Sequence, residues 1–248
     1  MVPRRWASSA LGRLARRPSR WLTQAFVWAY EVDLSEAQAT EFDSLDALFV
    51  RRLRAGTRPI DADPHAMVSP VDGTVAFCGP TDGRIPLGPV PFSLADVSNA
   101  APRVSAAIVL YLSPRDYHRV HAPLDGRVQA YRYLPGSRWP VFLAAVRRIP
   151  RLFARNERLV FEVDTDRGPM LVALVGAFGV GRIESPLLDE PPSQARSGDL
   201  DARVAKGEEM GVFHLGSTVI LGLPSVPTEW KVRVGAPVRM GQAIARFG

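Results

Sequence analysis

The chain has 248 residues, 46% of them hydrophobic and 23% charged, so it can bury a sizeable core and is not extensively disordered. Its single cysteine, Cys78, excludes a disulfide framework and a cysteine-rich metal site. The formal charge is +6, yet lysine occurs only as Lys206 and Lys231, which leaves two candidate positions for a lysine Schiff base.

The N-terminal segment is basic and then aromatic. Its first 20 residues carry six arginines and no acidic residue, and the apolar stretch "WLTQAFVWAY" follows. This stretch is about half of the roughly 20 residues that a membrane-spanning helix requires. We expect an amphipathic helix instead, with an apolar face made of Trp21, Leu22, Ala25, Phe26, Trp28 and Ala29. That face either lies on an anionic membrane surface or packs on the protein's own core, and the Arg-rich start also fits an organellar transit peptide.

The next segment changes from helical to strand-like patterning. "DSLDALFVRRLRAGTRPID" predicts a short helix that is capped at Asp43 or Ser44 and ends before Gly56. From about Thr74 the chain shows short apolar runs separated by turn residues: "TVAFC", "SAAIVLYL", "GRVQAYRYL", "RLVFEVDT", "PMLVALVGAFGVGRI", "STVILGL" and "WKVRV". We therefore predict an α+β fold, with a mainly antiparallel, sandwich-like or barrel-like β core preceded by N-terminal amphipathic helices.

Two further features bear on the architecture. The polar segment "ESPLLDEPPSQARSGDLDARVAKGEE" has little periodicity and is predicted to be a long mobile loop. The turns "SPVDGTV" and "APLDGRV" form a faint repeat of the kind found in small β domains that carry biotin or lipoate. Such a carrier needs a lysine at a hairpin tip, and neither lysine of this chain lies in these turns. The carrier hypothesis is therefore rejected.

The polar residues that could carry chemistry fall in two motifs. In "YLSPRDYHRVHAP", His118 and His121 are three residues apart, and either face a cleft or serve the structure. No third ligand accompanies them, so no metal site is expected, and the isolated His65 and His214 are predicted to be structural. In "LGSTVILGL", the Gly-Ser-Thr at the start of an apolar run fits either a bulge with locally bonded hydroxyls or a functional site.

Several motifs together resemble one family. "SPVDG", "SPRDYHRVHAP", "NERLVFEV", "LVGAFGVGRI" and "KGEEMGVFHLGST" occur in this order and at this spacing in the phosphatidylserine decarboxylase family. The resemblance runs from about Leu14 to the C-terminus, and "LFVRRLRAGTRPID" is similar to the family's stretch just before the catalytic core. The chain departs from the family at "GRIPLGPVPFSLADV". There Arg84 and Phe92 stand near the usual Lys-Gly and Tyr-Ser-Leu type segment, which leaves substrate contacts open.

The resemblance implies a self-processing proenzyme. The chain is expected to be cut between Gly216 and Ser217 into a large β chain (1–216) and a small α chain (217–248) that stay associated. Ser217 is expected to become the pyruvoyl group, which replaces the lysine-bound cofactor of other amino-acid decarboxylases. The implied reaction converts phosphatidylserine to phosphatidylethanolamine and carbon dioxide through a Schiff base with this group.

The resemblance also assigns residues to the cleavage reaction. Because a serine hydroxyl is a weak nucleophile, Asp72, His121 and Ser217 are expected to form a triad in which His121 is the base and Asp72 orients it. Gly216 leaves its carbonyl open to attack. Asp125, in the sister turn, is expected to be structural.

Three further residues are given supporting roles. His118 is expected to donate the proton after carbon dioxide leaves, because a histidine with an unperturbed pKa titrates near working pH. Asp116 is expected to position His118 or the substrate. Thr218 and nearby backbone N–H groups are candidates to hold the developing oxyanion.

The same resemblance suggests how the molecule is divided and where it works. Residues 1–55 are expected to form a helical membrane-associating region and residues 56–248 the β-rich catalytic domain. The expected partners are phosphatidylserine, an anionic membrane surface and a second copy of the chain; nucleic acid is not expected, because the arginines do not alternate with aromatic residues. The expected location is peripheral, on the cytoplasmic face of a bacterial cell membrane or, alternatively, on an organellar inner membrane.

Two alternative functions stay open from the sequence. One is an uncleaved β-sandwich binding protein attached peripherally to a membrane. The other is a pyruvoyl-dependent decarboxylase that acts on another serine-containing lipid or on an amino acid. The first differs from the main hypothesis in giving a single chain rather than two.

Overall fold

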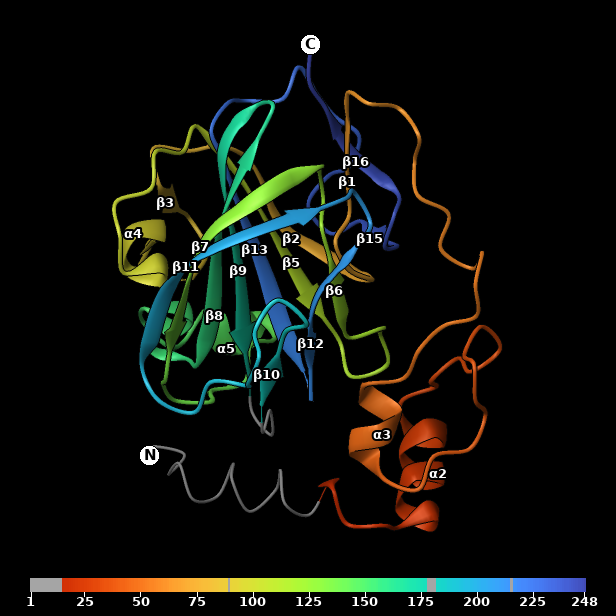
Figure 1. The fold of residues 1–248 in the computed structure, drawn as a ribbon. Coiled ribbons are helices and arrows are strands. Elements are labelled where there is room, and N and C mark those ends of the chain that lie inside the picture. The colour runs from red at the N-terminus through yellow and green to blue at the C-terminus, as the bar shows by residue number, and fades with distance from the viewer. Residues whose placement is uncertain (1–14, 89, 178–181, 215) are drawn as a thin grey trace.

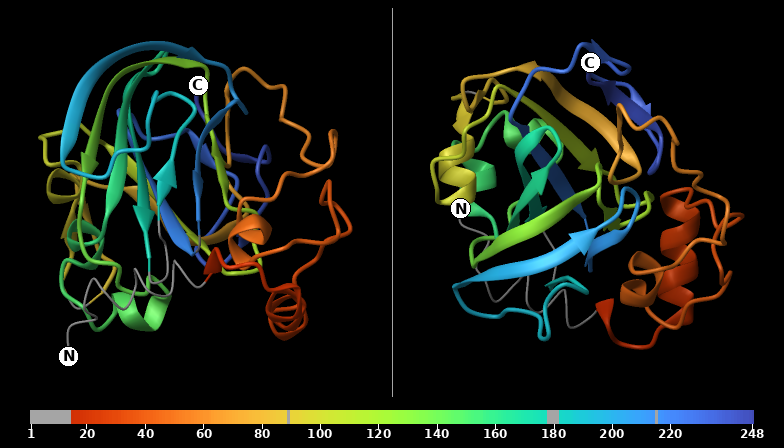
Figure 2. Two further views of the ribbon diagram at one scale, coloured as in Figure 1. Left: turned by 60° about the horizontal axis from the view of Figure 1, so that its bottom comes forward. Right: turned by 45° about the horizontal axis from the view of Figure 1, so that its top comes forward.

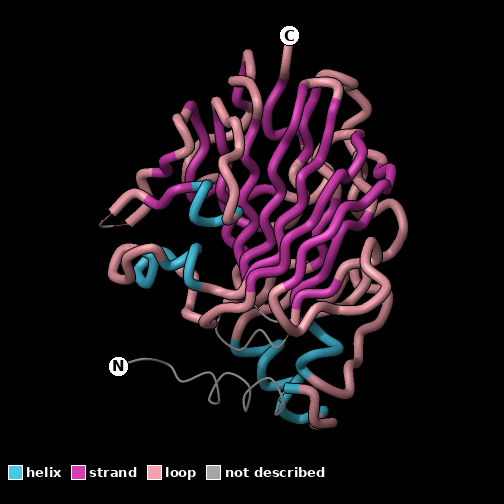
Figure 3. Tube along the Cα trace, turned by 60° about the vertical axis from the view of Figure 1, so that its left-hand side comes forward, coloured by secondary structure: helices cyan, strands magenta, loops and turns pink. Residues whose placement is uncertain are grey.

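The fold consists of a strand-rich body with short helices at its periphery (Figure 1, Figure 3). The computed structural model describes residues 15–88, 90–177, 182–214 and 216–248. Within these ranges every pair of named strands is antiparallel. The α+β class, the antiparallel β core and the preceding N-terminal helices are thus as the sequence predicted.

An eight-stranded sheet forms most of the body, and it is strongly twisted (Figure 2). Its strands, from one edge to the other, are β11 (Arg196–Val204), β7 (Gly126–Leu134), β8 (Arg158–Thr165), β9 (Gly168–Gly176), β13 (Ser217–Leu223), β5 (Ala106–Leu112), β2 (Gly73–Pro80) and β15 (Pro237–Val238). Because β11 and β15 lie at opposite edges and are not paired with each other, this sheet does not close into a barrel.

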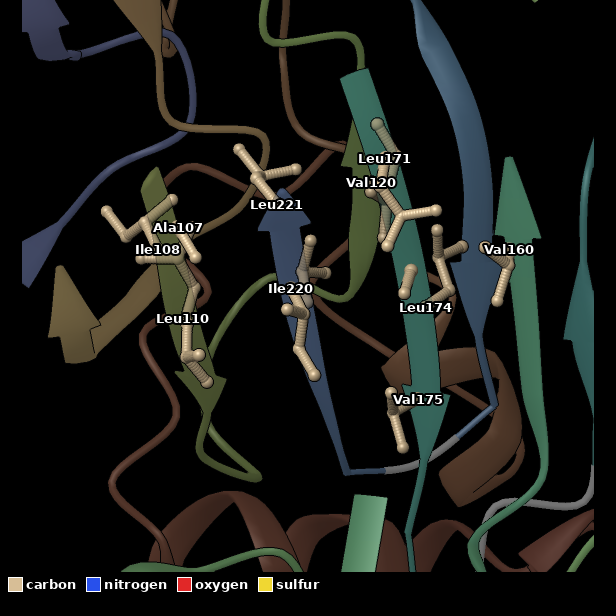
Figure 4. Close-up of a cluster of buried hydrophobic side chains, with 14 of the residues drawn as sticks. Ala107, Ile108, Leu110, Val120, Val160, Leu171, Leu174, Val175, Ile220 and Leu221 are labelled. Atoms are coloured by element: carbon tan, nitrogen blue, oxygen red, sulfur yellow. The ribbon is translucent and has the colours of Figure 1, made fainter. Parts of the chain in front are cut away.

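The centre of this sheet is the core of the protein. All seven residues of β13 are buried, and it lies between β9 and β5 with side chains of neighbouring strands packed around it (Figure 4). Burial on both faces requires a continuous apolar run rather than an alternating one, which is the pattern of "STVILGL" and "AAIVLYL".

Smaller sheets and helices surround the large sheet. The small sheets contain β1 (Ala66–Val68), β16 (Ala243–Arg246) and β14 (Glu229–Trp230); β10 (Ile183–Glu184), β12 (Glu209–Phe213) and β6 (Arg119–His121); and β3 (Arg84–Ile85) with β4 (Phe92–Ser93). The helices are α2 (Arg20–Ala29), α3 (Leu45–Phe49), α4 (Leu94–Ser98), α5 (Leu143–Val146) and α6 (Leu152–Arg155).

The two N-terminal helices lie together beside the ends of β6 and β12 (Figure 1). The Ser44 hydroxyl accepts a hydrogen bond from the Ala47 N–H at 3.1 Å, which confirms the predicted cap of α3. The helix ends at Phe49, earlier than the sequence suggested. The carbonyl groups that follow it accept from Arg119 instead of continuing the helix.

The prediction of a long mobile loop for "ESPLLDEPPSQARSGDLDARVAKGEE" is partly wrong. Nine of its residues form β11, which pairs with β7 at the edge of the large sheet. Most of the β11 side chains are exposed or half-buried, because an edge strand in this position has few neighbours to cover it. Polar and charged residues suit such an edge, because they oppose pairing with a strand of another chain. A strand of this composition has the same sequence pattern as a polar loop, which is why a loop was predicted.

Candidate active site

The two polar motifs meet where β13 begins. In the antiparallel ladders, Ser217 lies opposite Leu112 at the end of β5 and Gly176 at the end of β9. The histidine motif leaves directly from Leu112, so the topology brings it to this edge of the sheet. On the N-terminal side of the Gly-Ser-Thr motif, the Phe213 N–H donates to the His118 carbonyl at 3.0 Å. Both flanks of residues 214–216 are therefore tied to the histidine motif.

Gly216 is a glycine without a packing reason. A Cβ built on it would meet no atom within 4 Å, and its φ does not lie in the left-handed region that favours glycine. Glycine is often favoured where the backbone dihedral angles are strained, but the φ of Gly216 gives no such reason. What a side chain at this position would change is access to the adjacent carbonyl group.

Ser217 and Thr218 carry buried hydroxyls that make no hydrogen bond to any described residue. Both residues are almost fully buried, with exposed fractions of 0% and 1%. A buried hydroxyl without a partner is costly and calls for an explanation, such as a reactive or catalytic role. The bulge interpretation is wrong for these residues, because Ser217 and Thr218 sit in regular register on both sides of β13 and bond no local backbone.

His118 is fully buried and neutral. Its Nδ1–H donates to the carbonyl of Asp116 at 2.8 Å, its ring contacts Phe49 edge-on, and Nε2 has no partner among the described residues. Burial lowers the pKa of His118 to about 3, against the hydrogen bond to Asp116 that favours the charged form. The expectation of an unperturbed histidine is therefore wrong for the uncleaved chain. Asp116 contacts His118 through its backbone carbonyl, while its carboxylate accepts from the Ser113 N–H at 2.7 Å.

His121 is held in a defined tautomer. Its Nδ1–H donates to the Gly207 carbonyl at 2.8 Å, so Nε2 carries the lone pair, and the Tyr117 hydroxyl donates to Nε2 at 3.2 Å. The Tyr117 ring also stacks on the imidazole, with the ring centroids 5.8 Å apart. Burial lowers the pKa of His121 and raises that of Tyr117 to about 12, so at neutral pH the first is a neutral base and the second a proton donor.

Asp72 has a different partner from the one that the sequence suggested. Its carboxylate accepts from Arg58 Nε at 2.9 Å and Nη2 at 2.5 Å, and from the Met240 N–H at 2.8 Å. Arg58, whose side chain is only 7% exposed, also binds Glu36 at 2.6 Å. Among the described residues, Asp72 and His121 share no hydrogen bond, and the Gly207 carbonyl takes the orienting position on Nδ1.

Asp125 differs from Asp72 in its surroundings. Although both aspartates precede a glycine in the same kind of turn, Asp125 is exposed and accepts from the Lys206 N–H at 2.8 Å. This bond joins two turns of the backbone, which agrees with the structural role expected for Asp125.

A cleft of about 680 Å³ opens beside Asp72, Asp116 and Tyr117; Ser217 and the two histidines of the motif are not among its lining residues. Its walls come from the end of α2, the start of β2, the histidine motif and the segment before β16. The charged lining residues are of both signs: Glu31, Asp33, Glu36, Arg51, Arg58, Asp72, Arg115, Asp116 and Arg239. A smaller cavity of about 140 Å³ shares Thr74 with the cleft, reaches Thr218 and is lined mainly by apolar side chains. Among the described residues, no three His, Cys, Asp or Glu side chains gather as a metal site.

The sequence of the chain is similar to those of known proteins. A family model described as phosphatidylserine decarboxylase matches residues 45–246. The phosphatidylserine decarboxylase proenzyme of Halorhodospira halophila is 41% identical, over 100% of this chain and 91% of the relative. Those of Pseudomonas fluorescens Pf0-1 and Nitrosococcus oceani are 37% and 38% identical, over 99% and 100% of this chain and 95% and 89% of the relatives. The chain belongs to the phosphatidylserine decarboxylase family.

The departure from the family pattern is explained in part by packing. Phe92 is buried in β4 and meets Phe153 edge-on, with the ring centroids 4.8 Å apart, so it serves the core rather than a substrate contact. Arg84 is exposed at the start of β3. Neither residue lines the charged cleft.

Three residues of the site were missed by the sequence analysis. Arg58 and Tyr117 lie inside motifs that were noticed, in "GTRPID" and "DYHRVH", but their partners could not be read from spacing. Gly207 precedes "EEMGVF", and it takes part through a carbonyl group that every residue has. The only sequence signal for such partners was the presence of charged and polar residues within the recognised motifs.

Proposed function

We propose that the chain is a phosphatidylserine decarboxylase proenzyme that cuts itself between Gly216 and Ser217. The observation that carries the proposal is the buried, unpartnered Ser217 hydroxyl beside a glycine that packing does not require. Membership of a family whose relatives are named proenzymes supports the same conclusion. The cut would give a large chain of residues 1–216 and a small chain of residues 217–248.

The cleavage chemistry needs only groups of this chain and water. The Ser217 hydroxyl attacks the Gly216 carbonyl carbon, the C–N bond breaks, and an ester to the serine oxygen replaces the amide. Removal of the Ser217 α-proton then expels the Gly216 carboxylate and leaves dehydroalanine. Water converts the dehydroalanine to a pyruvoyl group and ammonia.

His121 is proposed as the base for the attack. The Gly207 carbonyl holds its Nδ1–H, and Nε2, which accepts from the Tyr117 hydroxyl in the uncleaved chain, would take the Ser217 proton after exchanging Tyr117 for Ser217. Burial keeps the imidazole neutral at working pH. Asp72, which is paired with Arg58, is proposed to stabilise the imidazolium that forms, acting at a distance in the uncleaved chain. Thr218 would support the oxyanion through its free hydroxyl.

The pyruvoyl group that Ser217 would supply is an electron sink for the carbanion left by a departing carboxylate. The unpartnered Ser217 hydroxyl and the open space at Gly216 fit its formation at this position. His118 is proposed to handle the proton that replaces the carboxylate, through Nε2, the nitrogen that Asp116 leaves free. Because His118 is neutral in the uncleaved chain, this role requires the site to open and admit a proton after cleavage.

The cleft and the N-terminal helix support a lipid substrate. Lining charges of both signs suit a head group that carries an ammonium, a carboxylate and a phosphate, and the adjoining cavity is apolar. Trp21 and Trp28 on α2 are 73% and 84% exposed, as a helix lying on a membrane surface requires. We infer that residues 1–55 bind the membrane, that residues 56–248 carry the reaction, and that the protein is peripheral. No helix within the described residues is long and apolar enough to cross a bilayer.

Intact-mass analysis and a set of variants test the proposal. Wild-type protein should give two chains, of which the small one carries a ketone and no free amine. Ser217→Ala and His121→Ala should stay whole, because a triad loses most of its rate with any member. His118→Ala should be cut but release little carbon dioxide from phosphatidylserine, while Asp125→Asn should do both.

The outcomes separate the hypotheses. Wild-type protein that is active but remains one chain contradicts the proposal. Wild-type protein that is neither active nor cut supports the alternative of a binding protein. If His118→Ala stays whole while His121→Ala is cut, the two histidines have exchanged roles. Carbon dioxide release from another serine-containing lipid or a free amino acid, but not from phosphatidylserine, changes the substrate only.

A further inference from the structure

The bond proposed to be cut lies in a crossing between two sheets. Phe213 ends β12, which belongs to the small sheet with β10 and β6, and Ser217 begins β13 in the large sheet. The Ser217 end is held by ladder bonds from both β5 and β9. Gly216 itself touches nothing at its Cβ position. The geometry of the carbonyl therefore depends on how the other end of the crossing is held.

His214 holds that other end. Its Nδ1 lies 2.8 Å from Asp46 Oδ1 in a hydrogen-bonded pair, and its Nε2 lies 3.0 Å from Glu184 Oε1, a close contact without hydrogen-bond alignment. The His214 side chain is 11% exposed. Its backbone N–H also donates to the Arg182 carbonyl at 3.3 Å, which extends the β10–β12 pairing by one residue. A histidine between two carboxylates is thus fixed two residues before Gly216.

The two carboxylates come from distant parts of the chain. Asp46 lies in the first turn of α3, in the N-terminal region, and Glu184 ends β10. Arg182 pairs with Glu184 at 2.8 Å and faces the same carboxylate as His214. The same helix places Phe49 against the ring of His118. One side of the cleavage crossing and one proposed catalytic histidine therefore both rest on α3.

We propose that His214 is a positioning residue for self-cleavage, one that anchors the cleavage crossing to α3 and β10. This inference rests on the proposed function, and it replaces the structural role predicted for His214 from its isolation in the sequence. Attack by Ser217 requires the Gly216 carbonyl to stay within reach and in line, and a small displacement of reacting groups lowers a rate steeply. Because Asp46 belongs to α3, fast self-cleavage would also require the N-terminal region to be docked on the body.

The first experiment measures cleavage of freshly translated full-length protein over time on a gel. His214→Gln should slow the cut by about tenfold or more, because it loses the contact to one or both carboxylates. His214→Lys keeps a hydrogen-bond donor that can reach a carboxylate and should restore much of the rate. Asp46→Ala should slow the cut by a similar factor and add little in the double variant with His214→Gln. His65→Gln, at a half-buried histidine that contacts Arg167, is the matched control and should cleave normally.

The second experiment does not depend on cleavage. In the Ser217→Ala background, hydrogen exchange of the peptide covering residues 210–218 should rise with His214→Gln and not with His65→Gln. A normal cleavage rate in His214→Gln overturns the inference. So does slow cleavage with unchanged exchange, since the residue would then not act by anchoring. If wild-type protein is never cut, the proposed function fails, and the exchange measurement still decides whether His214 holds the crossing.

Discussion

His118 and His121 are three residues apart, but their rings have different surroundings and so are suited to different reactions. His118 is enclosed against Phe49, whereas His121 lies between the Gly207 carbonyl and the Tyr117 hydroxyl. The doublet itself could be recognised from the sequence. Its partners could not, because Gly207 lies 86 residues away and contributes only a backbone carbonyl.

The lowered pKa of His121 makes the pH dependence of self-cleavage testable. Burial disfavours the imidazolium, so the base stays neutral as the pH falls through 6.5, where an ordinary histidine is half protonated. The cleavage rate of newly made protein, followed on gels, should therefore change little between pH 8 and 6.5 and decline only below that range.

A matching control uses the variant that loses the Tyr117 hydroxyl. In Tyr117→Phe the hydrogen bond that favours neutral His121 is absent, so the decline should begin at a higher pH than in the wild type. A wild-type rate that is already halved at pH 6.5 would mean that the base has an ordinary pKa and is not the buried His121.

Asp72 illustrates a second limit of reading residues from spacing. The turn "PVDG" marked an aspartate near the cleft, but its closest charged partner is Arg58, in a segment whose sequence indicated only a helix end and a resemblance to the family. The pair extends through Glu36 to Arg239, and so joins the N-terminal region to the segment before β16. Ion pairs between distant elements follow from the packed fold, which a single sequence does not display.

At the scale of elements, the central strands were predictable and the edge strand was not. β5, β9 and β13 are buried on both faces, so their sequences are continuous apolar runs. β11 has little to pack against, so its polar sequence has no strand signature and it becomes a strand only through its pairing with β7. The repeated Asp-Gly turn also has a physical cause. Cβ atoms at Gly73 and Gly126 would lie 2.5 Å and 2.7 Å from carbonyl oxygens of neighbouring strands.

Glycine substitutions separate folding from chemistry at this scale. Gly73→Ala should lower the free energy of unfolding by about 1–3 kcal/mol or more, because its methyl group would collide with the backbone of Tyr111. Gly216→Ala should leave stability nearly unchanged, since the space is open, yet slow self-cleavage because the methyl group stands beside the attacked carbonyl. Urea unfolding, in the Ser217→Ala background for a uniform chain, and cleavage gels give the two readouts. A large loss of stability in Gly216→Ala would contradict the open environment described for it.

At the scale of the whole molecule, the N-terminal helices and the strand-rich body share the wall of one cleft. Ala29 and Tyr30, at the end of α2, line the same space as Asp72 and Asp116 (Figure 1 shows α2 and α3 beside the body). The sequence predicted the helix and its aromatic face, but it left open whether that face is exposed and did not indicate that the C-terminal end of the helix borders the candidate site. A helix that lay on a lipid surface would therefore bring the cleft to that surface.

The exposed tryptophans test this placement. The double variant Trp21→Ala/Trp28→Ala should bind vesicles of phosphatidylcholine and phosphatidylglycerol about tenfold more weakly or worse, since burying each large apolar side chain is worth about 1.5–3 kcal/mol. Self-cleavage should persist, because both side chains are largely exposed and neither lines the cleft. Val226→Ala/Val234→Ala removes two other exposed apolar side chains and should bind like the wild type in a vesicle sedimentation assay. Equal binding by all three proteins would exclude α2 as the membrane contact.

The position of β13 has a consequence for whether the cleaved protein could refold after it unfolds. A cut at Gly216 leaves the central strand of the large sheet on a fragment of residues 217–248, clamped between β9 and β5 and carrying β14, β15 and β16 with it. While the chain is whole, its covalent link keeps that strand at a high effective concentration beside its neighbours. After the cut, a molecule that unfolds loses the strand to dilution, and no continuous sequence remains to direct its return. Maturation would then turn a refoldable polypeptide into one assembled only once, whose working life is set by its rate of unfolding rather than by an equilibrium.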